Sequence, residues 1–203
     1  MPTTPKPDGR ETRAIVTALE LRSADDAGRT ATGYAALFDV WTDVAGLWRE
    51  KIAPGAFTRT LQERDVLALH SHDGGRVMGR TGAGTLTLRE DAKGLWFENP
   101  LPDTTDGRDL IVQLERRDIA GMSFGFISVR SEWDETGDMV ERTILEAELY
   151  EITYTARPQY ADTEVALRSL EHARLERRQH NREGASARIA ARRARQAHAE
   201  RRI

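Results

Sequence analysis

Three kinds of side chain in this sequence could together form a nucleophilic site. Ser123 lies in the stretch "DIAGMSFGF", with Gly121 and Gly125 on either side, where a peptide backbone could approach closely. A serine hydroxyl is a poor nucleophile at neutral pH unless a base takes its proton. A histidine can be that base, and a carboxylate can hold the imidazole in the useful tautomer. Without both partners, Ser123 would be only a small residue filling a strand.

The candidate bases are two histidines in the stretch "LHSHD", His70 and His72. If this stretch is one strand, the two side chains point to the same face. His72 is the better candidate because it lies at the strand end, just before the turn signal "DGGR". A strand histidine is more often structural, and two histidines without a third or a cysteine make a poor zinc site. The other histidines lie in the arginine-rich tail, where we expect solvated helix residues: His172, His180 and His198.

The candidate acid is Glu151 in "TILEAELYEITYT". Strand alternation places it in one row with apolar residues, whereas Glu146 and Glu148 lie on the other, partly solvated face. Burying an unpaired carboxylate is costly. Glu151 therefore needs a partner, which is either Arg157 in a structural salt bridge or a histidine that it orients.

The elements that must position these residues are mostly strands. Two long strands, Ala120–Trp133 and Val140–Tyr154, carry Ser123 and Glu151 and are joined by the loop "DETGD". Amphipathic spacing predicts short helices within 53–64 and 104–118. Further strands are predicted within 13–22, 30–40, 65–73, 84–91 and 93–99. This pattern predicts an α+β domain with a mixed or antiparallel sheet or a closed barrel.

The 203 residues suit one domain with appendages. We expect a disordered leader at 1–12, a folded body at 13–167 and a basic helical tail at 168–203. The tail holds 11 Arg and 4 Glu, so the net charge of −3 divides into +7 there and −10 elsewhere. The chain has no cysteine, and no stretch predicts a membrane span or a secretory signal. We therefore expect a soluble cytoplasmic protein.

Five blocks of the sequence together resemble the prohead (procapsid maturation) proteases of tailed bacteriophages. The resemblance runs from about Gly33 to about Val165, and its most specific parts are the second and fourth blocks. The blocks are "EKIAPGAFTRTL", "VLALHSHDGGRVMGR", "KGLWFE", "TTDGRDLIVQLERRDIAGMSFGF" and "LYEITYTARPQY". The spacing around Ser123 also fits GxSxG. That motif needs a strand–turn–helix context, whereas Ser123 follows a helix and enters a strand, so an α/β-hydrolase is excluded.

The resemblance implies His72 as general base, Ser123 as nucleophile and an acid near "LYEIT", which is Glu151 with Glu148 as the fallback. His70 ranks second as base. The family is similar in fold to the herpesvirus assemblins, so the resemblance implies a mostly antiparallel β-barrel surrounded by short helices, with no cofactor or metal. Assemblins use a second histidine as the third member, and no histidine lies downstream of Ser123 within the body.

Two further positions depart from the family pattern. Asp118 stands before Ile119 where the family often has glycine. The assemblin arginine that follows the serine strand has no secure counterpart, and Arg157 and Arg130 are the candidates for the oxyanion site.

The resemblance implies a serine endopeptidase of phage capsid maturation, in the host cytoplasm and inside the immature procapsid. The expected partners are scaffold protein and the scaffold-like segment of the major capsid protein precursor, with self-cleavage also expected. Self-association is left open, and neither a membrane nor nucleic acid is expected as a partner. For the tail we favour a role in packing the protease into the shell. The alternative function is a non-catalytic capsid assembly protein that keeps the protease fold.

Overall fold

The computed structural model describes residues 9–16, 19–24 and 28–156, with scattered residues between 170 and 192. The chain divides into two units, residues 1–166 and 167–203. Residues 1–8 of the predicted leader and most of the predicted basic tail lie outside the described residues, although the described tail residues are helical. No helix in the described part of the chain is long and apolar enough to cross a membrane.

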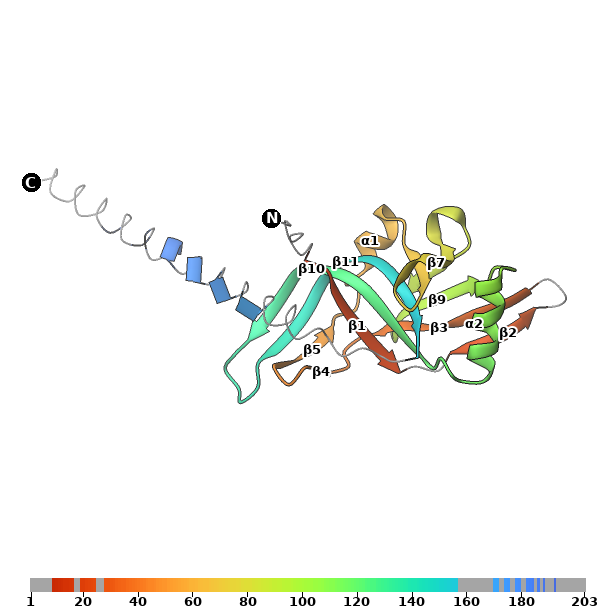
Figure 1. Cartoon of the computed structure of the whole chain (residues 1–203). Coiled ribbons are helices and arrows are strands. Elements are labelled where there is room, and N and C mark those ends of the chain that lie inside the picture. Colours follow the sequence, from red (N-terminus) through yellow and green to blue (C-terminus); the bar gives the residue numbers. More distant parts are fainter. Residues whose placement is uncertain are drawn as a thin grey trace, which may run out of the picture. The chain divides into compact units, whose positions relative to one another are not determined.

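The larger sheet is built around two long antiparallel strands, β10 (Gly121–Asp134) and β11 (Glu141–Thr155) (Figure 1). On the far side of β10 lies β1, and β11 continues to β5 and then β4. A second branch leads from β11 to β6 and from there to β7. The bounds of these five strands are Glu11–Val16 (β1), Thr42–Val44 (β4), Trp48–Ile52 (β5), Leu67–His70 (β6) and Asp73–Arg80 (β7).

The smaller sheet has four antiparallel strands in the order β2-β3-β9-β8. The two sheets share one core, in which the rings of Phe97 and Tyr154 meet edge to face at 5.9 Å. Tyr154 also donates a hydrogen bond across the core to Asn99 Oδ1 at 2.9 Å. The strands of this sheet are Glu20–Ala24 (β2), Gly28–Leu37 (β3), Thr87–Glu90 (β8) and Gly94–Pro100 (β9).

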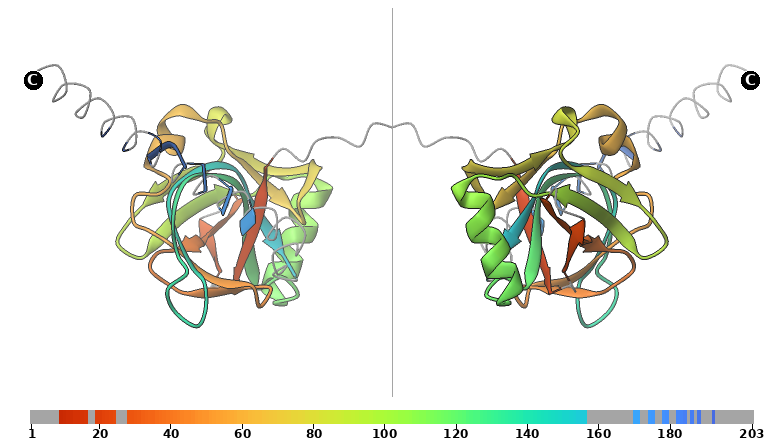
Figure 2. Two further views of the ribbon diagram at one scale, coloured as in Figure 1. Left: turned by 90° about the vertical axis from the view of Figure 1, so that its left-hand side faces the viewer. Right: turned by 90° about the vertical axis from the view of Figure 1, so that its right-hand side faces the viewer.

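Both predicted helices form. Helix α2 (Thr105–Glu115) begins where the Thr104 hydroxyl accepts a hydrogen bond from Gly107 N at 3.1 Å, an N-cap that satisfies one free amide of the first turn. Its apolar side, with Leu110 and Ile111, is buried, and the helix lies outside the strands in Figure 2. Helix α1 (Thr58–Glu63) is shorter, and a 3₁₀ turn, η1 (Thr81–Ala83), follows β7.

The closed barrel is a wrong prediction, whereas the mostly antiparallel pairing is confirmed and the larger sheet is mixed. Strand β11 runs parallel to β5 at residues 141–144 and parallel to β6 at residues 151–154. Between these two partners its amides bond to the α1 region, as Ala147 N does to Ala56 O at 2.8 Å. Strands β5 and β6 nevertheless belong to the same sheet as β11, and the described strands form two separate sheets and not one closed barrel.

The first predicted strand is two strands. The pattern over residues 13–22 was continuous, but β1 ends at Val16 and β2 begins at Glu20. The two belong to different sheets. Strand β1 also begins at Glu11, within the stretch predicted as leader.

A cluster of four buried charges ties β1 to β5 and β11. Arg13 and Arg142 bind the carboxylates of Glu11 and Glu50 through hydrogen bonds of 2.7–3.1 Å. All four residues are less than 10% exposed, and their charges cancel. Burial alone would raise the pKa of Glu11, but the hydrogen bond and charge of Arg142 and the charge of Arg13 outweigh it and lower that pKa.

We predict that Arg142→Met strongly destabilises the fold. The substitution leaves two buried carboxylates with one guanidinium, and breaking such a cluster costs about 3–5 kcal/mol. Chemical denaturation measures the free energy of unfolding. The control is Arg130→Met, because Arg130 is exposed on β10 and its replacement should change that free energy little. Equal losses in the two variants would contradict a special role for the cluster.

Candidate active site

His72 lies in a two-residue turn and not in a strand. Strand β6 ends at His70, and the pairing of His70 with Asp73 closes the turn around Ser71 and His72. Both turn residues have left-handed backbones, with φ of 55° and 58°. This conformation costs a residue with a side chain roughly 1–2 kcal/mol, which is why Asn-Gly or Gly-Gly is usual here. The predicted turn at "DGGR" is wrong, because that stretch begins β7.

Contacts with β11 hold this turn. Ser71 N donates to Tyr154 O at 2.9 Å, and His72 N donates to the Thr153 hydroxyl at 3.0 Å. The His72 ring is fixed separately, because its Nδ1 lies 2.5 Å from Glu151 Oε1. Its Nε2 is buried and has no hydrogen-bond partner within the described structure. If Nδ1–H donates to the carboxylate, Nε2 carries the lone pair and can accept a proton.

Glu151 reaches His72 because of a β-bulge. Glu151 pairs with Gly125, but the next pair along the two strands is Leu149 with Phe126, so Tyr150 is an extra residue. The bulge reverses the side-chain alternation, and Glu151 therefore lies on the opposite face from the buried Leu149. The predicted row that joined Glu151 to Leu149 is wrong, although the prediction that Glu151 needs a partner holds.

Gly125 makes room for the Glu151 side chain. A Cβ at residue 125 would lie 3.0 Å from Glu151 Cγ and 3.2 Å from Glu151 Oε1. The space that the sequence suggested for an approaching peptide is therefore filled by the carboxylate that contacts His72.

Ser123 lies on this same face of the sheet. It pairs with Thr153 on β11 and with Ala14 on β1. The side chains of paired residues on adjacent strands point to the same side of the sheet. Thr153 and Glu151 are two residues apart, so Ser123, Thr153 and Glu151 share the face on which the His72 ring is held. The Ser123 side chain is fully buried, and its hydroxyl donates to Arg13 O at 2.9 Å. In this arrangement the hydroxyl bonds to β1 and not to His72.

His70, the second-ranked base, is the last residue of β6, whereas His72 lies in the turn that follows. His70 pairs with Tyr154, is 4% exposed, and its Nδ1 has no partner among the described residues. Burial, followed by the positive charge of Arg76, lowers the pKa of the His70 imidazole. His70 is therefore a neutral residue beside the core, and the prediction that both histidines point to one face is wrong.

The fallback acid, Glu148, is engaged elsewhere. Its carboxylate accepts a hydrogen bond from Tyr150 Oη at 2.9 Å and forms an ion pair with Arg64. The Tyr150 hydrogen bond and the Arg64 contacts lower the pKa of Glu148. Glu151, and not Glu148, is thus the carboxylate in contact with His72.

Of the two arginines considered for an oxyanion site, the structure describes only Arg130, and it is not brought to Ser123. Arg130 is exposed and lies seven residues further along β10, a distance of roughly 23 Å in an extended strand. Arg157 lies outside the described residues.

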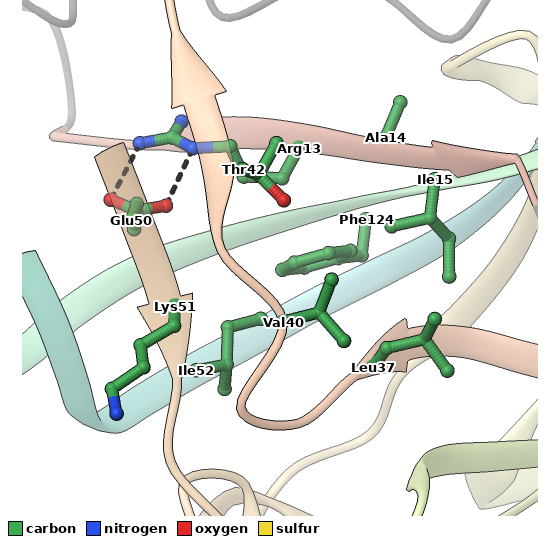
Figure 3. Close-up of a pocket in the computed structure, with 10 residues that line it drawn as sticks. All are labelled: Arg13, Ala14, Ile15, Leu37, Val40, Thr42, Glu50, Lys51, Ile52 and Phe124. Atoms are coloured by element: carbon green, nitrogen blue, oxygen red, sulfur yellow. Dashed lines mark hydrogen bonds and ion pairs between the residues drawn. The ribbon is translucent and has the colours of Figure 1, made fainter. Parts of the chain in front are cut away.

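A pocket opens on the opposite side of β10. Phe124, whose side chain alternates with that of Ser123, lines it together with Ile15 and Val40, and the Arg13–Glu50 ion pair lies at one end (Figure 3). This pocket therefore does not contain the Ser123, His72 and Glu151 side chains. Among the described residues, no group of three or more His, Cys, Asp or Glu side chains could hold a metal ion.

Two residues that contact His72 and Ser123 were not predicted from the sequence, namely Thr153 and Arg13. Thr153 follows Glu151 by two positions, and the period of two could have identified it as a neighbour on the same face. The bond to Arg13 joins residues 110 positions apart and involves a main-chain oxygen, so no side-chain pattern could have indicated it.

We predict that Gly125→Ala moves Glu151 away from His72. The new methyl group would crowd the carboxylate, and overpacking of this kind costs about 1–3 kcal/mol. A crystal structure of the variant should show a longer Nδ1–Oε1 distance, and denaturation should show reduced stability. Gly137→Ala is the control, because a Cβ there meets only Met139 O at 3.8 Å. An unchanged His72–Glu151 contact in Gly125→Ala would contradict the packing argument.

Neither the curated proteins nor the solved structures contain a match to this chain. A family model described as the caudovirus prohead serine protease matches residues 17–177, which is most of the chain. The matched range contains His72, Ser123 and Glu151 and begins directly after β1. The chain belongs to the caudovirus prohead serine protease family.

Proposed function

We propose that this protein is a serine endopeptidase in which Ser123 is the nucleophile, His72 the general base and Glu151 the acid that orients it. One observation carries the proposal. His72 Nδ1 contacts Glu151 at 2.5 Å while its Nε2 is buried and unpartnered within the described structure, on the sheet face that bears Ser123. A base held by a carboxylate, with its second nitrogen available, is the arrangement that activates a serine hydroxyl.

The reaction begins when the Ser123 hydroxyl turns from Arg13 O to His72 Nε2. For this the Ser123 side chain must leave its present rotamer for another staggered position. Ser123 Oγ then attacks a peptide carbonyl carbon as its proton passes to Nε2. The imidazolium returns this proton to the leaving amine, which departs as the carbon–nitrogen bond breaks. Water, deprotonated by His72, then hydrolyses the acyl ester and restores Ser123.

Glu151 has two tasks in this scheme. It accepts the Nδ1–H bond, which fixes the tautomer with the lone pair on Nε2, and its charge stabilises the imidazolium that forms. The 19% exposure of its side chain keeps it partly shielded from solvent, so its interaction with His72 is stronger than a surface ion pair. The neighbouring Gly125 allows the carboxylate to stay in this position.

The proposed substrates follow from the family. A prohead protease acts on capsid-related proteins, and we propose scaffold protein or the scaffold-like segment of the major capsid protein precursor. Cleavage would occur inside the immature procapsid, and self-cleavage belongs to the same proposal. The proposed task of the basic tail is to bring the protease into the shell.

One observation favours a second candidate, a non-catalytic assembly protein with the protease fold. Ser123 is fully buried and its hydroxyl serves the main chain of β1, as a structural serine would. The contact between His72 and Glu151 argues for catalysis, because a short imidazole–carboxylate pair with a free Nε2 has no evident structural purpose.

We predict that Ser123→Ala abolishes processing of co-expressed capsid precursor while leaving the fold intact, since only one buried hydroxyl is lost. Mass spectrometry of assembled particles would detect the unprocessed precursor. Ser128→Ala, which removes a hydroxyl from the same strand, is the control and should process normally. Continued processing by Ser123→Ala would exclude Ser123 as the nucleophile.

We predict that Glu151→Gln slows processing by about 100- to 10,000-fold, because an amide neither fixes the tautomer reliably nor balances the imidazolium charge. A time course of precursor cleavage measures the rate. The matched control is Glu148→Gln, three residues earlier on β11, which should stay near the wild-type rate. If the control lost activity and Glu151→Gln did not, the acid would have to be reassigned.

A further inference from the structure

The position of His72 depends on its main chain as well as its ring. Its left-handed φ of 58° is unfavourable for a residue with a side chain, so contacts must hold the turn in this form. Two hydrogen bonds connect the turn amides to β11: Ser71 N to Tyr154 O, and His72 N to Thr153 Oγ1. Of these two hydrogen bonds, only the one to Thr153 involves a side chain, and only that one is donated by the amide of His72.

Thr153 lies between the three residues of the proposed site. It pairs with Ser123 on β10, and it is two positions from Glu151 on the same face of β11. It is fully buried, and its hydroxyl oxygen lies 3.0 Å from His72 N. His72 is thus attached to β11 at two points, through its amide to Thr153 and through Nδ1 to Glu151. Two points of attachment fix where Nε2 lies, whereas Glu151 alone would leave the ring free to pivot.

We propose that Thr153 is a positioning residue for the His72 base, acting through its hydroxyl oxygen. The inference rests on the proposed function and adds a fourth residue to it. Because β11 carries both Thr153 and Glu151, the main chain and the ring of His72 are held by one rigid strand that also pairs with the strand of Ser123. A displacement of about 1 Å in such a site costs about 100-fold in rate.

A purely structural role for Thr153 makes different predictions. If the residue only fills space, Thr153→Val should be harmless because it keeps the shape, and Thr153→Ser should be harmful because it loses a methyl group. If the hydroxyl positions His72, the order is reversed. The pair Thr153→Ser and Thr153→Ala adds a second comparison, since both lose the methyl group and they differ only in the hydroxyl.

The test measures how fast Ser123 reacts with a fluorophosphonate reagent, which needs no knowledge of the natural substrate. The Ser123 oxygen bonds to phosphorus, fluoride leaves, and the serine proton passes to His72 Nε2. Intact mass spectrometry follows the full-length chain over time. Thr153→Val and Thr153→Ala should react about 10- to 100-fold more slowly than wild type, and Thr153→Ser should stay near the wild-type rate.

Thr60→Val is the matched control. The Thr60 hydroxyl is also buried and also accepts a hydrogen bond from a main-chain amide of β11, Leu149 N at 3.0 Å, but it lies on α1. This variant should lose stability, as Thr153→Val does, without losing reactivity. The melting temperature of each variant separates the two effects.

Each outcome decides the inference. A wild-type rate in Thr153→Val, or equal losses in the Ser and Ala variants, would overturn the role of Thr153 while leaving the proposed function in place. If Thr153→Val fails to fold, the comparison of Ser with Ala gives the answer. If wild type and Ser123→Ala are labelled alike, or neither is labelled, the proposed function fails, and this inference fails with it.

Discussion

The antiparallel pairing of β10 with β11 is the interaction on which the rest of the structure depends. Every other strand of the larger sheet is attached to one of these two directly or through one neighbour. Their register sets Ser123 opposite Thr153 and Gly125 opposite Glu151. The bulge at Tyr150 then determines which face receives the Glu151 carboxylate. Without that single extra residue, the carboxylate would point into the apolar core, where a charge without a partner is costly.

The electrostatics of the molecule divide along the same sheet. On the core side, Arg13 and Arg142 neutralise Glu11 and Glu50 completely, and every polar group in the cluster has a partner. On the other side, the His72–Glu151 pair leaves Nε2 without a partner in the described structure. A buried polar atom without a hydrogen bond is costly, and such atoms are concentrated at functional sites. The charge cluster is therefore fully paired, whereas the His72–Glu151 pair keeps one nitrogen without a partner in the described structure.

Much of this arrangement could be predicted from the sequence. The two long strands, the hairpin between them and both helices follow from local periodicity and are confirmed. Strand alternation predicts Glu151 in one row with Leu149, and this is wrong because the bulge at Tyr150 shifts the alternation. The residue types alone do not reveal such a bulge. The turn at Ser71 and His72 could not be predicted either, because a left-handed backbone is uncommon for any residue other than glycine, even though histidine adopts it more often than most. The parallel pairings of β11 join residues 84 and 92 positions apart, and the alternation of side chains alone does not choose between parallel and antiparallel partners.

Arg13 has a double role that links the two sides of the sheet. Its guanidinium belongs to the buried charge cluster, whereas its carbonyl oxygen accepts the hydroxyl hydrogen of Ser123. It lies on β1, which precedes the range matched by the family model. One residue of this edge strand therefore connects the buried charge cluster to the Ser123 side chain on the other face of the sheet. A substitution or truncation that displaces β1 would therefore also move the Arg13 carbonyl, the group that holds the Ser123 hydroxyl in its present orientation.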